Sequence, residues 1–136
     1  MEKQAVLYVN KSKIEDSLEV TLQRLLQDYE SVKKKTGDQL GWAFEHRAFP
    51  YTIERISHDD HEGLLLQGKN KDYHQIELVT STPSTQQPLV YINLHEKATH
   101  GDLSKAIELA KFIAERICSK LQLFNGRVMT YQPVKK

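Results

Sequence analysis

The sequence predicts an α+β protein with a mostly antiparallel sheet of five to six strands and two helices packed on one face. Two stretches carry apolar residues at helical spacing, and short β-type runs occupy much of the remaining chain. Four of these runs follow one another with only short polar breaks, which is typical of an antiparallel meander. The expected order is strand, helix, four strands, helix, strand. A chain of 136 residues corresponds to a single α+β domain over residues 1–136.

The first strand and first helix are predicted at the N-terminus. Residues 4–9 read QAVLYV and have strand composition. Ser12 and Asp16 each stand three residues before a glutamate and are alternative N-caps. Gly37 is a natural residue just beyond the end of the helix. The apolar face between these limits comprises Leu18, Leu22, Leu25, Leu26, Tyr29 and Val32.

The meander is predicted between residues 51 and 94. Its four runs start at Tyr51, Gly63, Tyr73 and Leu89, and residues 81–88 form the most loop-like segment. In the third run, Ile76 and Leu78 alternate with Glu77 and Val79, so the two pairs face opposite sides of the sheet.

The second helix is predicted over residues 99–123. Thr99 and Asp102 have capping-box spacing, and Asn125-Gly126 ends the helix or makes a tight turn. Residues 127–131 form the last strand. The apolar stripe comprises Leu103, Ala106, Ile107, Ala110, Ile113, Ile117 and Leu121.

With both helices on one face, the other face of the sheet is open. Leu65, Val79, Tyr91 and Tyr131 are expected on it. An open apolar face favours a homodimer, or contact with an unknown protein partner.

Composition excludes several classes of function. There are 19 Lys and Arg against 18 Asp and Glu, so the near-neutral charge makes nucleic acid an unlikely partner. No apolar run approaches the roughly 20 residues of a membrane span. The N-terminus lacks a signal peptide, and Cys118 is the single cysteine, so we expect a cytoplasmic protein. Cys118 itself is expected to be a buried structural thiol in the second helix.

Two histidine patterns resemble metal sites. His58 and His61 enclose two aspartates, but they lie in a predicted turn. His95 and His100 are five residues apart, whereas the zinc-protease motif needs a spacing of four on one helical face. We therefore predict no metal site, no catalytic residue and no cofactor.

Four runs resemble a small family of unknown function from spore-forming Gram-positive bacteria. They are TGDQLGW at 36–42, AFPY at 48–51, ATHGD at 98–102 and LFNGRVMTY at 123–131. The resemblance implies a bacterial cytosolic α+β domain and transfers no site. It draws attention to seven residues whose folding and binding roles the sequence does not separate, namely Trp42, His100, Gly101, Asp102, Asn125, Gly126 and Arg127.

Two functions follow. The first is a non-enzymatic binding or interaction module that associates with itself. The alternative is a ligand-binding protein or hydrolase, with a pocket near Trp42 and the His95–Asp102 link. The backbone N–H groups at the start of the second helix could receive an anion there, although Asp102 competes for them. The candidate ligand-binding residues are Trp42, His95, His100, Asp102 and Arg127. Convergence of His46, His95, His100 and Asp102 on one pocket would favour the alternative.

Overall fold

The computed structural model describes residues 3–14, 17–40, 50–58, 61–81 and 88–131. The helices are α1 (Leu18–Leu40), α3 (His100–Ile117) and a short 3-10 helix, η1 (Lys11–Lys13). The strands are β1 (Lys3–Val9), β2 (Tyr51–His58), β3 (His61–Gly68), β4 (Gln75–Ser81), β5 (Leu89–Leu94), β6 (Cys118–Gln122) and β7 (Val128–Thr130). The predicted α+β class is confirmed, with seven strands in the described sheet rather than five or six.

The strands lie in the order β2-β3-β4-β5-β1-β6-β7, and every neighbouring pair is antiparallel. The meander from β2 to β5 follows the chain, as predicted. β1 then closes on β5, with Leu7 opposite Val90, and β6 pairs with the other edge of β1. The first strand of the chain therefore lies between segments that are distant in sequence.

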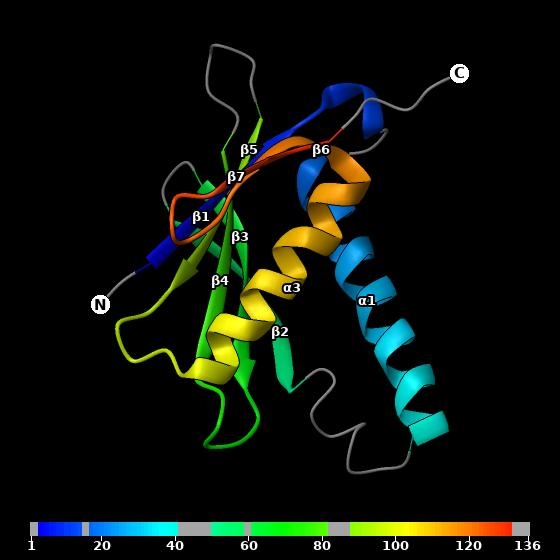
Figure 1. The fold of residues 1–136 in the computed structure, drawn as a ribbon, viewed down its shortest axis with the longest axis vertical. Coiled ribbons are helices and arrows are strands. Elements are labelled where there is room, and N and C mark those ends of the chain that lie inside the picture. The colour runs from blue at the N-terminus through cyan, green and yellow to red at the C-terminus, as the bar shows by residue number, and fades with distance from the viewer. Residues whose placement is uncertain (1–2, 15–16, 41–49, 59–60, 82–87, 132–136) are drawn as a thin grey trace.

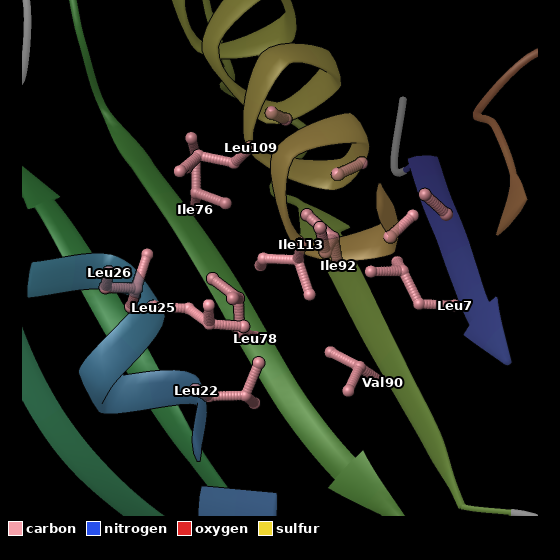
Figure 2. Close-up of a cluster of buried hydrophobic side chains, with 14 of the residues drawn as sticks. Leu7, Leu22, Leu25, Leu26, Ile76, Leu78, Val90, Ile92, Leu109 and Ile113 are labelled. Carbon is pink, nitrogen blue, oxygen red and sulfur yellow. The ribbon is translucent and has the colours of Figure 1, made fainter. Parts of the chain in front are cut away.

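Both helices cover the same face of the sheet (Figure 1). Ile113 of α3 and Leu22 of α1 are fully buried there, beside Leu78 and Ile92 from the central strands (Figure 2). Burial alternates strictly along β4 and β5, which is the pattern of strands with one covered face. Each large buried side chain contributes about 1.5–3 kcal/mol to folding.

The opposite side of the sheet, the outer face, carries the alternate residues of the same strands. Leu65, Val79 and Tyr91 occupy outer positions, as predicted, and are partly exposed. The prediction for Tyr131 is wrong, because this residue packs against the core and its hydroxyl is buried. Tyr131 comes two residues after Met129, which pairs with Leu121 on the covered side. Alternate residues of an extended chain share one side, so Tyr131 lies on the covered side as well.

The predicted second helix is too long. α3 begins with the expected capping box of Thr99 and Asp102, but it ends at Ile117. Residues 118–122 form β6, because the free edge of β1 offers backbone partners to them. Leu121 continues the helical spacing by coincidence and reaches the same core from a strand. Cys118 is therefore the first residue of a strand, although it is buried as expected.

α1 also departs from its predicted limits. It begins at Leu18, and the Ser17 hydroxyl accepts a hydrogen bond from the backbone N–H of Val20 at 3.3 Å. It continues past Gly37 to Leu40. In the part of the chain that the structure describes, neither helix has the length and apolar character of a membrane span.

Candidate functional site

The buried carboxylate of Asp102 joins three segments at the start of α3. It accepts hydrogen bonds from the Tyr51 hydroxyl at 2.5 Å and from the Thr99 backbone N–H at 2.9 Å. The backbone N–H of His74 donates to both of its oxygens, at 2.9 and 3.1 Å. Asp102 is completely buried, so these donors replace the water that a carboxylate would otherwise require.

Tyr51 is held in its protonated form. Burial raises the pKa of its hydroxyl, and the hydrogen bond to Asp102 raises it further. The Thr99 hydroxyl donates to the Asp72 carbonyl at 2.7 Å and accepts from the Asp102 N–H at 3.0 Å. The helix terminus that could have received an anion is thus capped by Thr99, and Asp102 adds negative charge beside it.

The histidines of the predicted site lie around this cluster without meeting. His95 accepts a hydrogen bond from the Lys97 backbone N–H at 3.1 Å, and its ring contacts the His74 ring edge-on at 5.2 Å. His100 is the exposed first residue of α3. His95 and His100 line different surface hollows, and Asp102 lines neither of them.

The two remaining residues of the predicted site are Trp42 and Arg127. Trp42, with His46, is outside the described residues. Arg127 is exposed in the turn between β6 and β7, where its backbone N–H donates to the Asn125 side chain at 2.9 Å. Gly126 provides the positive φ of 89° that this turn requires. The ligand-binding role of the five residues stays a prediction.

A contiguous set of apolar side chains lies on the outer face, and we call it the outer-face band. Cross-strand pairing forms one row of Val79, Tyr91 and Val6, and a second row of Leu89 and Tyr8. Leu65 flanks the first row from β3. These side chains are partly exposed. Sequence alternation identified Leu65, Val79 and Tyr91, but Val6 and Tyr8 were missed because residues 5–9 are apolar on both faces.

Polar groups border the outer-face band. On one side, Gln4 donates to Asn93 at 2.8 Å, and Asn93 donates to Glu77 at 3.0 Å. On the other side, the Lys120 ammonium lies over the Tyr8 ring, 4.2 Å from its centroid. The band therefore has an acidic border at Glu77 and a basic border at Lys120.

Cys118 and the possible metal ligands are the remaining candidates for reaction chemistry. Burial raises the pKa of the Cys118 thiol to about 12, so it is not ionised at neutral pH and is a poor nucleophile. No group of three or more His, Cys, Asp or Glu side chains is placed to hold a metal ion in the described ranges.

Comparison with known proteins identifies relatives without a described activity. A family described as a domain of unknown function, DUF1885, matches residues 3–133. The crystal structure of a protein of unknown function from Bacillus stearothermophilus is also similar, with a TM-score of 0.60 and 36% sequence identity. The match covers 86% of this chain and 91% of the other. No curated protein matches.

Proposed function

The chain belongs to the DUF1885 family, and we propose that it is a non-enzymatic interaction module that forms a homodimer through the outer face of its sheet. The outer-face band is the observation that carries this proposal. Contact with a second surface would remove this contiguous apolar surface from water, which lowers the free energy of the sheet. The partner that we propose is a second copy of the same chain.

The outer face is large enough for such a contact. Six spacings of about 4.8 Å make a seven-stranded sheet about 29 Å wide, and six residues of β5 extend about 20 Å. The projected area is roughly 600 Å², of the same order as the ~800 Å² that each partner contributes to a standard interface.

The charges at the border of the band suit a two-fold dimer. Glu77 on β4 and Lys120 on β6 lie on diagonally opposite sides of the row of Val79, Tyr91 and Val6. A two-fold axis in the interface, between Tyr91 and Val6, brings Glu77 of each copy toward Lys120 of the other. The same patch therefore complements itself in charge as well as in apolar character.

The alternative, a ligand-binding protein or hydrolase near Trp42, has less support. Asp102 is occupied by hydrogen bonds within the fold, and His95 and His100 line different hollows. The cytoplasm remains our proposed compartment, and the single buried, free thiol of Cys118 supports a reducing environment.

Sedimentation velocity across a dilution series tests the proposal. We expect the wild-type chain to sediment as a concentration-dependent dimer, and Tyr91→Lys to sediment as a monomer. Val20→Lys is the matched control, because Val20 is 44% exposed on α1, away from the outer face. A wild-type chain that is monomeric at every concentration would overturn the proposal, as would a Tyr91→Lys protein that remains dimeric.

A charge exchange tests the placement of the axis. Glu77→Lys and Lys120→Glu should each weaken the dimer, because each places like charges face to face. The double variant should restore the association. If the double variant is weaker than both single variants, the two-fold axis does not pass between Tyr91 and Val6.

A further inference from the structure

A small cavity lies on the helix-covered side of the sheet, beyond the core. It has a volume of about 230 Å³ and lies between the N-terminal half of α1 and adjacent parts of β2, β3 and β4. The inward positions of β2 change from apolar to polar along the strand, from Tyr51 and Ile53 to Arg55 and Ser57. Arg55 pairs with the inward-facing Leu64, so a charged residue occupies a position where the pattern predicts an apolar one.

A hydrogen-bonded group faces the cavity from α1 and β4. Thr80 is 5% exposed, and its hydroxyl donates toward a carboxylate oxygen of Glu19 at 3.1 Å and toward the Glu62 carbonyl at 3.0 Å. One hydroxyl hydrogen serves two acceptors, and a carboxylate offers about four acceptor positions. Glu19 therefore keeps accepting capacity for a donor that enters the cavity.

The remaining walls give the cavity two kinds of surface. Leu64 provides an apolar wall, while Arg55 lies exposed among the lining residues. The carboxylate of Glu19 is in the first turn of α1, where the helix dipole stabilises its negative charge. The cavity thus combines a fixed anionic acceptor with an apolar wall and a more accessible cation.

We propose that this cavity binds a small amphipathic ammonium ligand, of the size of an aliphatic amino acid or its amine. The ammonium group donates to Glu19, and the aliphatic body packs on Leu64. In an amino acid, the carboxylate faces Arg55. The volume is below the several hundred cubic ångströms of sites for drug-sized molecules, so a ligand of this small size fits.

An NMR titration with three probes tests the site. Isopentylamine supplies the ammonium and the aliphatic body, leucine adds a carboxylate, and 4-methylpentanoate replaces the ammonium with a carboxylate. We expect saturable shifts of the backbone amide signals of Glu19, Leu64 and Thr80 with the first two probes. Shifts that do not saturate with isopentylamine, or equal binding of 4-methylpentanoate, would overturn the proposal.

Two matched variants identify the residue that recognises the ammonium group. Glu19→Gln should weaken isopentylamine binding by about tenfold or more, because it removes a charged hydrogen bond. Glu30→Gln makes the same chemical change at an exposed site on the same helix and should leave the affinity unchanged. An unchanged affinity in Glu19→Gln, in a protein whose spectrum shows the native fold, would overturn the assignment.

A third variant tests the contact with the carboxylate of an amino acid. Arg55→Gln should weaken leucine binding but not isopentylamine binding. An equal effect on both probes would exclude a carboxylate contact at Arg55.

Discussion

The two faces of the sheet consist of alternate residues from the same strands, yet their surroundings differ. On β5, Ile92 is completely buried beneath α3, whereas its neighbours Tyr91 and Asn93 face outward and are partly exposed. The covered face is apolar except at its end near Arg55, Ser57 and Thr80, while the outer face mixes apolar side chains with amides and charges. The difference predicts that substitutions on the covered face reduce stability more than those on the outer face, which is the face we propose for recognition.

The largest expected effect is the insertion of a charge into the covered face. Ile113→Asp places a carboxylate where the wild-type side chain is completely buried, between α3 and the sheet. We expect a loss of about 4–5 kcal/mol or more, enough to unfold many domains. Circular dichroism during urea titration measures this loss. Ser104→Asp, an exposed change on the same helix, should cost little, and a similar loss in both variants would contradict the comparison.

The second effect concerns the buried polar cluster at the start of α3. Asp102→Ala leaves the donors of Tyr51, His74 and Thr99 without their acceptor, so we expect a loss of about 3 kcal/mol or more. Asp102→Asn keeps one acceptor oxygen and should lose less. Equilibrium unfolding in urea measures both losses. An Asp102→Ala protein as stable as the wild type would show that the cluster has no structural role.

The third prediction compares neighbouring residues that face opposite sides. Ile92→Ala should cost about 2–5 kcal/mol, because it leaves a cavity in the core. Tyr91→Thr replaces one residue type that is favoured in strands with another, so it should cost the monomer much less, and it should weaken the proposed homodimer. Measurements of unfolding and sedimentation on both variants separate the two effects. A greater loss of monomer stability in Tyr91→Thr than in Ile92→Ala would contradict the assignment of stability to the covered face.

The smallest effect appears only at alkaline pH. Burial raises the pKa of the Cys118 thiol from 9.0 to about 12. Above pH 9 the unfolded chain therefore loses this proton before the folded chain does, so stability should fall as pH rises toward 12. Cys118→Ala should show a shallower fall between pH 9 and 10 in urea titrations. Equal slopes would show that the thiol is accessible in the folded state.

The local signals in the sequence were sufficient for much of the fold. The capping box of Thr99 and Asp102, the turn at Asn125-Gly126 and the alternation in β4 were predicted from neighbouring residues alone. Each depends on interactions within a few positions, such as a side chain that caps its own helix. Such interactions can be predicted without knowledge of the rest of the chain.

Interactions between distant segments decided what the sequence could not. The spacing of Ile117 and Leu121 fits a helix, but pairing with β1 makes residues 118–122 a strand. Thr99 and Asp102 indicated a helix cap, yet only the fold brings Tyr51 and His74 to the same carboxylate. The cavity at Glu19 and Thr80 likewise joins residues that are 61 positions apart. The sequence by itself determined the type of most elements, because propensity and periodicity are local. The tertiary structure decided their ends and their partners, because edge pairing and burial depend on contacts across the whole chain.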